Sequence, residues 1–262
     1  MLLRRLKNRF LKAWYKRGYY IPDALQKPIP PPRFDILPDG FSIHRLAATG
    51  VIAVDNFCTE EEALYLIDKA RGRLQPSTVV NPDTDGLVYN THRKSADAGV
   101  YDLFDKDPLA YRFVERAAML LGVPVDHAES FPVTYYDNGD YFKEHMDAFP
   151  SFNGDRQYTV LVYLNEVGDD NGGETIFTNL GIVSKPRFCR AIIWRNYLND
   201  GSVNELSKHS AQPLKEGAEK WVVQLGFRRY PMFKGPGLQG EPKLQPLGST
   251  DELPEGVELQ QS

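Results

Sequence analysis

The sequence predicts an α+β, mainly β fold in which helices pack on one side of a β-sandwich or barrel. Three observations lead to this prediction. Two amphipathic helical patterns occupy 59–71 and 108–121. From about residue 128 onward, short runs of β-branched and aromatic residues alternate with turns rich in Gly, Asn and Asp. The chain of 262 residues is also long enough to bury a sizeable core.

Each predicted helix has sequence signals at its start or end. Thr59 and Glu62 form a capping-box pattern at the start of the first helix, and Gly72 follows its last turn. Asp107 is the predicted N-cap of the second helix, with Pro108 in its first turn. Both helices carry an apolar stripe for the core: Ala63, Leu66, Ile67 and Ala70 in the first, and Leu109, Phe113, Ala117 and Leu120 in the second.

The predicted strands lie where apolar and β-branched residues are dense and turn residues flank them. A strand at 51–57 opens the ordered domain, which we expect to span 50–233. The later strands are predicted at 158–164, 174–177, 188–194 and 221–227. No internal repeat is visible in this region.

The two ends of the chain differ from this domain in composition. Residues 1–20 contain seven Lys or Arg and no Asp or Glu, and the apolar residues of 1–18 fall on one stripe of a helix. We expect this basic amphipathic helix to dock on the domain; the alternatives are contact with an anionic membrane surface and a mitochondrial transit peptide. Residues 21–49 form a Pro-rich connector, and 234–262 form a flexible, acidic tail rich in Pro and Gly.

Composition argues against several classes of protein. A net charge of −4 gives no reason to expect nucleic-acid binding. Cys58 and Cys189 form no disulfide framework, which favours a reducing, cytoplasmic location, with peripheral membrane contact through 1–18 as an addition. No apolar stretch approaches the roughly 20 residues that a transmembrane helix needs. The sequence predicts no particular oligomeric state.

His145 and Asp147 are candidate metal ligands, because residues i and i+2 of a strand point to the same face. A His-x-Asp pair alone is more often structural, so a third ligand is required. His209 fits, because it precedes a turn with Pro213 and Gly217 that leads into a strand. Two imidazoles and one carboxylate leave three coordination positions open, as in non-haem iron(II) sites that activate O2. A structural zinc site normally has four protein ligands.

Lys220 begins that strand and adds a second constraint on the site. A lysine that points into an apolar barrel is costly unless it pairs with an anion. We expect the anion to be a carboxylate of a cosubstrate. The alternative is a lysine that faces water at the end of the strand.

Three segments follow one another along the chain: "YYDNGDYFKEHMDAF", "RQYTVLVYLNEVGDDNGGETIF" and "NDGSVNELSKHSAQPLKEGAEKW". With "VIAVDNFCTEEEALYLI" and the "RKS" that begins at Arg93, they resemble the prolyl 4-hydroxylase family of Fe(II)/2-oxoglutarate-dependent dioxygenases, from about Gly50 to Tyr230. The resemblance implies a double-stranded β-helix (jelly-roll, cupin-like) core with helices packed on one side. It also implies Fe(II) as the metal, 2-oxoglutarate and O2 as cosubstrates, and ascorbate as an accessory reductant.

The resemblance implies a role for each matching residue. His145, Asp147 and His209 would bind the iron and form the catalytic centre. Lys220 would pair with the distal carboxylate of 2-oxoglutarate, and the Tyr163 hydroxyl would assist it.

Four more residues are implied around this centre. Tyr136, nine residues before the first His ligand, would line the cosubstrate pocket, and Thr175 would lie close by. Arg93 and Trp194 would lie on the substrate side. The alternative for Trp194, as for Tyr163, is simple core packing, and the alternative for Arg93 is a position on the surface.

The chain departs from the family pattern at three places. Lys220 follows His209 by eleven residues where the family has ten, and one extra residue in the turn at 217–220 is expected to restore the strand register. A glycine expected before the strand "AIIW" is replaced around Cys189, and Phe142 stands where the family has a tyrosine. These changes leave the iron ligands in place and bear on the choice of substrate.

The implied reaction couples oxidative decarboxylation of 2-oxoglutarate, which yields succinate and CO2, to hydroxylation of a C–H bond. The carboxylate of Asp147 keeps one coordination position filled, which favours hydroxylation over halogenation. A prolyl residue in a peptide or protein is the expected substrate, and a free amino acid or natural-product intermediate is the alternative. The alternatives from other classes are a non-catalytic metal- or ligand-binding β-barrel, a zinc hydrolase and a membrane-associated scaffold.

Overall fold

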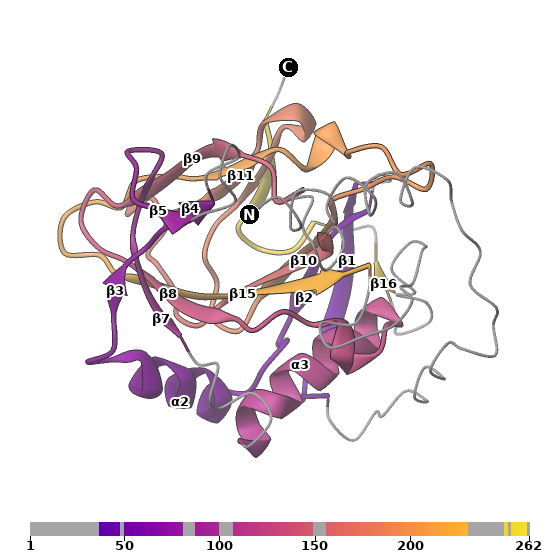
Figure 1. The fold of residues 1–262 in the computed structure, drawn as a ribbon, viewed down its shortest axis with the longest axis horizontal. Coiled ribbons are helices and arrows are strands. Elements are labelled where there is room, and N and C mark those ends of the chain that lie inside the picture. Colours follow the sequence, from indigo (N-terminus) through magenta and orange to yellow (C-terminus); the bar gives the residue numbers. More distant parts are fainter. Residues whose placement is uncertain are drawn as a thin grey trace, which may run out of the picture.

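The computed structural model describes residues 37–47, 50–80, 87–99, 107–148, 156–229, 249–250 and 253–260. The helix predicted at 1–18 and the connector up to residue 36 lie outside the described residues. Two β-sheets face each other, and two helices cover the outer face of the larger sheet (Figure 1).

The larger sheet has nine strands within the described residues, in the order β16-β1-β2-β13-β10-β15-β8-β7-β3, and only its β1–β16 pair is parallel. The smaller sheet has six strands there, all antiparallel, in the order β17-β12-β11-β14-β9-β6. The strands of the larger sheet are β1 Ser42–Ala47, β2 Val51–Asp55, β3 Gln75–Pro76, β7 Ala96–Gly99, β8 Pro132–Tyr136, β10 Arg156–Tyr163, β13 Ala191–Arg195, β15 Lys220–Arg228 and β16 Ser249–Thr250. Those of the smaller sheet are β6 Arg93–Lys94, β9 Tyr141–His145, β11 Thr175–Phe177, β12 Ile182–Ser184, β14 His209–Ala211 and β17 Val257–Leu259. The remaining elements are a hairpin of β4 Val79–Val80 and β5 Leu87–Val88, helices α2 Glu60–Ala70 and α3 Pro108–Leu121, and 3-10 turns at Val125–His127, Thr178–Leu180 and Glu205–Ser207.

Both predicted helices are confirmed to within one residue at each end. The Thr59 hydroxyl accepts a hydrogen bond from the backbone N–H of Glu62, whose carboxylate accepts one from the Thr59 N–H. Asp107 accepts from the N–H groups of Leu109 and Ala110. These caps satisfy donors that a helix start leaves unpaired, which explains why local sequence located the helices so well.

The buried core has two parts, one on each side of the larger sheet. The part beneath the helices includes Phe57, Leu66, Phe113, Val160 and Phe227. The part between the two sheets includes Tyr136, Tyr163, Phe177, Trp194 and Val222. Since three of these were predicted to belong to the functional site, the site lies in the interior of the barrel.

The prediction of a connector over 21–49 is wrong for its C-terminal end. Residues 42–47 form β1, which pairs antiparallel with β2, and Ile43 is fully buried there. The segment does not alternate polar and apolar residues regularly, because the strand has a register shift between Arg45 and Ala47, and it follows a Pro-rich stretch. Its pairing with β2 across the turn at Gly50 stabilises a strand that composition did not reveal.

The prediction of a flexible tail over 234–262 is wrong for 249–250 and 257–259. β16 pairs with β1, β17 pairs with β12, and Val257 is 6% exposed. Backbone groups make both pairings, so a segment with few apolar residues can still join a sheet edge.

The strand predicted at 188–194 starts later than expected, at Ala191. Cys189 precedes it with a φ of 60°, a conformation that favours glycine. This is the place where the resemblance led us to expect a glycine, and Cys189 has a backbone conformation that glycine adopts without strain.

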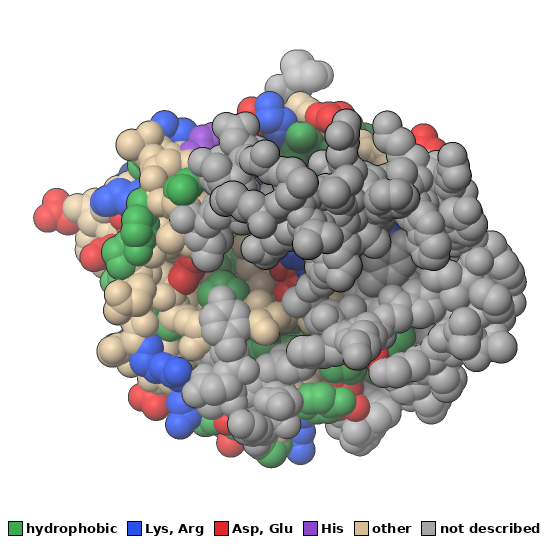
Figure 2. All heavy atoms as spheres, in the orientation of Figure 1, with side chains coloured by type: hydrophobic (Ala, Val, Ile, Leu, Met, Phe, Trp, Pro, Cys, Tyr) green, Lys and Arg blue, Asp and Glu red, His purple; other side chains and the backbone are tan. Residues whose placement is uncertain are grey.

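Within the described residues, no helix is both long and apolar enough to cross a membrane. Figure 2 shows acidic and basic side chains intermixed over the described part of one face. A surface that binds nucleic acid is typically basic over a continuous area. The absence of nucleic-acid binding and the cytoplasmic location stay predictions.

Candidate metal centre

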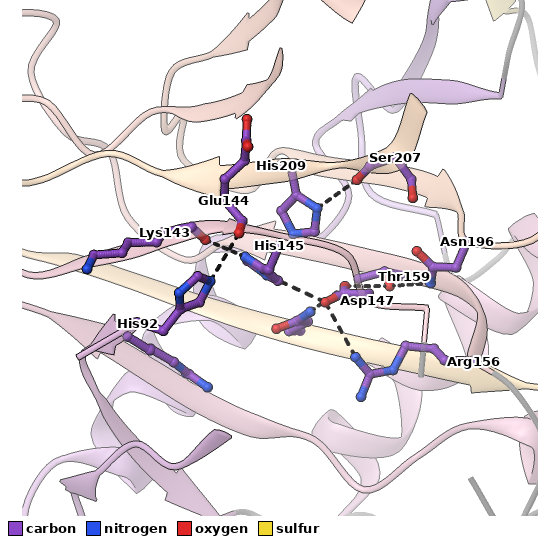
Figure 3. Close-up of polar contacts among 12 residues, drawn as sticks. His92, Lys143, Glu144, His145, Asp147, Arg156, Thr159, Asn196, Ser207 and His209 are labelled. Carbon is purple, nitrogen blue, oxygen red and sulfur yellow. Dashed lines mark hydrogen bonds and ion pairs between the residues drawn. The ribbon is translucent and has the colours of Figure 1, made fainter. Parts of the chain in front are cut away.

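The three predicted metal ligands come together in the barrel interior. His145 is the last residue of β9 and His209 is the first of β14, and the two are direct partners in the strand pairing. Asp147 follows β9 by two residues. One ligand atom from each side chain lies within 4.8 Å of the other two (Figure 3).

The two imidazoles are held in the same way. The Nδ1 atom of His145 lies 2.7 Å from the carbonyl oxygen of Lys143, and Nδ1 of His209 lies 2.9 Å from that of Ser207. A carbonyl oxygen can only accept, so each Nδ1 carries the proton and donates. Each Nε2 therefore keeps its lone pair, which is the form that binds a metal.

Hydrogen bonds distinguish the two carboxylate oxygens of Asp147. Oδ2 accepts from the Thr159 hydroxyl at 2.8 Å and from Gln224 Nε2 at 2.7 Å. Oδ1 faces His145 Nε2 at 3.7 Å. Oδ1 is thus the atom available to a metal, while Oδ2 fixes the orientation of the carboxylate.

Protonation states at neutral pH suit a divalent cation. Burial and the neighbouring His209 lower the pKa of His145 to about 3. Burial raises the pKa of Asp147, but the two histidines, Arg156 and the Thr159 hydrogen bond bring it down to about 2. Two neutral imidazoles and one carboxylate, with no thiolate among them, form a donor set that fits iron(II).

An ion pair beside the centre was not predicted from the sequence. The Arg156 guanidinium donates to both carboxylate oxygens of Glu129 at 2.7 and 2.8 Å, and its Nη1 lies 3.6 Å from Asp147 Oδ1. Burial raises the pKa of Glu129, but Arg156 and Arg228 hold it below its usual value. Arg156 opens one of the quoted segments, but Glu129 lies 27 positions before it and outside those segments, so no sequence signal linked the two.

Gly226 of β15 makes room for this ion pair, since a Cβ there would lie 2.6 Å from Arg156 Nε. We expect Gly226→Ala to displace the guanidinium from Asp147 and to weaken metal binding by about tenfold. Calorimetric titration with Mn(II) measures this. Glu61→Ala is the control, because Glu61 is exposed in the first turn of α2. An unchanged Kd in Gly226→Ala would show that Arg156 does not position the ligand.

Lys220, predicted to hold the cosubstrate, is 1% exposed. Its Nζ donates to the Gly173 carbonyl at 2.8 Å and lies 4.2 Å from the centre of the Tyr136 ring. Burial lowers its pKa to about 7. β15 begins at Lys220, which is paired with Tyr136 of β8, and the effect of the extra residue in the preceding turn stays a prediction.

Tyr163 and Thr175 lie together on the inner walls of the two sheets. The Tyr163 hydroxyl donates to Thr175 Oγ1 at 2.8 Å, and both side chains are buried. Tyr163 pairs with Val222 of β15, and Val222 lies two residues after Lys220. The side chains of Tyr163 and Lys220 therefore share the inner face of the sheet. The structure thus places Lys220, Tyr163, Tyr136 and Thr175 around one end of the barrel interior.

Arg93 and Trp194 are held by neighbours. Arg93 donates to Asp97 Oδ1 and to Ser95 Oγ, each at 2.7 Å, and its side chain is 11% exposed. Trp194 is fully buried, and the centre of its ring lies 4.6 Å from that of His209. Trp194 therefore packs behind a metal ligand, and a substrate role for either residue stays a prediction.

Comparisons with known proteins agree with this geometry. Residues 131–228 match the model of the 2OG-Fe(II) oxygenase superfamily. The chain is 30% identical over 190 residues to Probable prolyl 4-hydroxylase 3 of Arabidopsis thaliana, covering 63% of this chain and 64% of that protein. It is 28% identical over 200 residues to Prolyl 4-hydroxylase subunit alpha-2 of Gallus gallus, covering 74% and 35%. The chain thus spans less than two thirds of the length of either relative.

A solved structure confirms the fold. The viral collagen prolyl hydroxylase of Paramecium Bursaria Chlorella virus-1, in complex with 2OG, superposes with a TM-score of 0.51 at 22% identity, covering 69% of this chain and 97% of that one. The predicted double-stranded β-helix with helices on one side is therefore correct. In sequence, the chain is similar to prolyl 4-hydroxylases, and its residues 131–228 match the 2OG-Fe(II) oxygenase superfamily.

Proposed function

We propose that this protein is an iron(II)- and 2-oxoglutarate-dependent dioxygenase that hydroxylates a prolyl residue in a peptide or protein. The observation that carries the proposal is the pairing of a three-ligand centre with a buried lysine in one barrel interior. A zinc hydrolase or a passive binding barrel has no use for a buried lysine that lacks an ion-pair partner among the described residues. A dicarboxylate cosubstrate supplies that partner.

His145 Nε2, His209 Nε2 and Asp147 Oδ1 would hold the iron. Bound iron and 2-oxoglutarate would together supply O2 activation and the oxidising power for C–H hydroxylation. Lys220 would bind the distal carboxylate, and the Tyr163 hydroxyl would donate to it. The buried walls around these groups exclude water, which strengthens each of these polar contacts.

The position of the iron relative to the cosubstrate follows from one strand. On the inner face of β10, Thr159 contacts Asp147, and Tyr163 lies four residues further toward Lys220. Gln157 precedes Thr159 by two residues on β10, in the direction away from Tyr163. The substrate would enter from the side of Gln157.

Two buried amides on that side support a peptide substrate. The backbone N–H of Asn196 donates to the Gln157 carbonyl at 2.8 Å, so the two residues are cross-strand neighbours. Gln157 Nε2 and Asn196 Oδ1 are buried without hydrogen-bond partners among the described residues. One donor and one acceptor match the C=O and N–H of a peptide chain. A free amino acid would bring full charges, which neither amide balances.

The proposal is tested by anaerobic addition of iron(II) and then 2-oxoglutarate. Wild type should develop the weak visible charge-transfer band of the chelate, and His145→Ala should not. Prolyl peptides should then stimulate succinate release, and hydroxyproline should appear in the peptide. A wild type without the band rules out the dioxygenase. If the band forms but succinate release is stimulated by free amino acids and not by peptides, the substrate is a free amino acid and not a prolyl residue in a peptide.

We expect Gln157→Met to raise the KM for a prolyl peptide by about tenfold, because one hydrogen bond to a buried group is worth about 1.5 kcal/mol. The KM for 2-oxoglutarate should stay the same. The ligand-free protein should be as stable as wild type or more so, since methionine removes a buried donor with no partner among the described residues. Thermal unfolding and steady-state kinetics measure both effects; a fall in stability would mean that the amide is structural.

A further inference from the structure

The segment 253–260, called the C-terminal strap below, lies outside the part of the chain that matches the family model. It joins the edge of the smaller sheet. Val257 of β17 pairs with Ser184 of β12, which in turn pairs with Thr175 of β11. The strap is therefore two strands away from a residue of the cosubstrate pocket.

Several contacts fix the strap in place. The Lys185 N–H donates to the Gly256 carbonyl at 2.8 Å, and the Gln260 N–H donates to the Gly181 carbonyl at 2.6 Å. The Arg190 guanidinium donates to the carbonyl oxygen of Glu255. The strap is thus held to both ends of β12 by its backbone.

Arg187 adds a side-chain anchor. Its guanidinium forms ion pairs with Glu255 at 3.4 Å and Asp169 at 3.0 Å. A Cβ on Gly256 would lie 2.8 Å from Arg187 Nε, and Gly256 has a φ of 73°. Only glycine meets both conditions easily, because it adopts positive φ without strain and leaves room for the guanidinium.

The inner side of the strap reaches the pocket through β12. Val257 belongs to the same buried cluster as Tyr163 and Phe177. The Tyr163 hydroxyl lies 3.3 Å from the Ser184 carbonyl oxygen and 2.8 Å from Thr175 Oγ1. The position of β12 therefore determines where the Tyr163 hydroxyl finds its partners.

We propose that the C-terminal strap is a positioning element for the cosubstrate: it fixes β12, and thereby holds Tyr163 and Thr175 where they receive a carboxylate. The identity of that carboxylate as 2-oxoglutarate rests on the proposed function. The strap is three strands away from His209 on β14, so it positions the cosubstrate and not the metal.

The test compares two disrupting variants of the full chain with one control. Gly256→Val forces a strained φ and a clash with Arg187, and Val257→Asp places a charge in the buried cluster. Leu259→Asp is the control, because Leu259 lies on the same strand and is 54% exposed. The Kd values for Mn(II), and for 2-oxoglutarate in the presence of Mn(II), are measured for each protein by tryptophan fluorescence.

Both disrupting variants should raise the Kd for 2-oxoglutarate by about tenfold or more while the Kd for Mn(II) changes by less than about twofold. Leu259→Asp should leave both unchanged. Arg187→Gln removes the anchor with less disruption, and it should show the same selective effect if either variant folds poorly. The proposal is overturned if all the variants bind 2-oxoglutarate as wild type does, or if metal and cosubstrate affinity fall together. A wild type that does not bind 2-oxoglutarate at all overturns the proposed function as well.

Discussion

Lys220→Met reduces the affinity for 2-oxoglutarate by at least about 30-fold, because losing one partner of a buried, hydrogen-bonded charge pair costs about 2 kcal/mol or more. The affinity for the metal should be unchanged, because the Lys220 ammonium contacts the Gly173 carbonyl and the Tyr136 ring, and neither residue is a metal ligand. Titration of the iron(II) protein under anaerobic conditions measures both. Lys69→Met on α2 is the control for loss of one positive charge. A Lys220→Met protein that binds 2-oxoglutarate normally would place the distal carboxylate elsewhere.

The same lysine makes cosubstrate binding depend on pH. Burial lowers its pKa from 10.5 to about 7, so the ligand-free protein loses this positive charge as pH rises through 7. The dicarboxylate needs the charged form, and its Kd should therefore rise by up to about tenfold per pH unit above 7. Lys220→Arg keeps its charge throughout this range and should lose the dependence.

The stability of the ligand-free protein should rise with pH above 7, whereas the affinity for 2-oxoglutarate falls. The unfolded chain keeps the lysine proton up to about pH 10.5, whereas the folded protein releases it near 7. The free energy of unfolding therefore gains from rising pH between these values. Denaturant titrations of wild type and Lys220→Met at several pH values isolate this contribution.

Asp147→Asn should abolish tight metal binding, with a loss of about 100-fold or more, while the fold is kept. Thr159 and Gln224 both donate to the Oδ2 position, so the asparagine oxygen must occupy it. The NH2 group then takes the Oδ1 position and presents donors, with no lone pair for the metal.

Calorimetry with Mn(II) measures the loss, and far-UV circular dichroism checks the fold. Asp68→Asn, an exposed change on α2, controls for charge. Tight metal binding by Asp147→Asn would mean that Oδ2 is the true ligand atom and that its two donors rearrange.

Local signals account for what the sequence predicted well. The helix at 108–121 was located by its N-cap and its apolar stripe, both of which act within a few residues. The metal ligands were found because His145, Asp147 and His209 lie in motifs whose order was informative as a set. Their side chains meet through a cross-strand pair that the spacing alone did not specify.

Nonlocal contacts account for what the sequence missed. β16 and β17 are held by backbone bonds to strands far away along the chain, and such bonds leave little trace in side-chain composition. The Glu129–Arg156 pair depends on the space above Gly226, which only the assembled sheet reveals. These features became visible only when the strand order was known.

The two hydrogen bonds to Asp147 Oδ2 join the metal centre to the larger sheet, through Thr159 of β10 and Gln224 of β15. His145 and His209 belong to the smaller sheet. An ion held by all three side chains would therefore clamp the two layers of the barrel together. Its binding energy would add to the folding energy, by about 2.7 kcal/mol when free metal exceeds the Kd a hundredfold. The metal content of a preparation would then set its melting temperature, and a chelator would lower it.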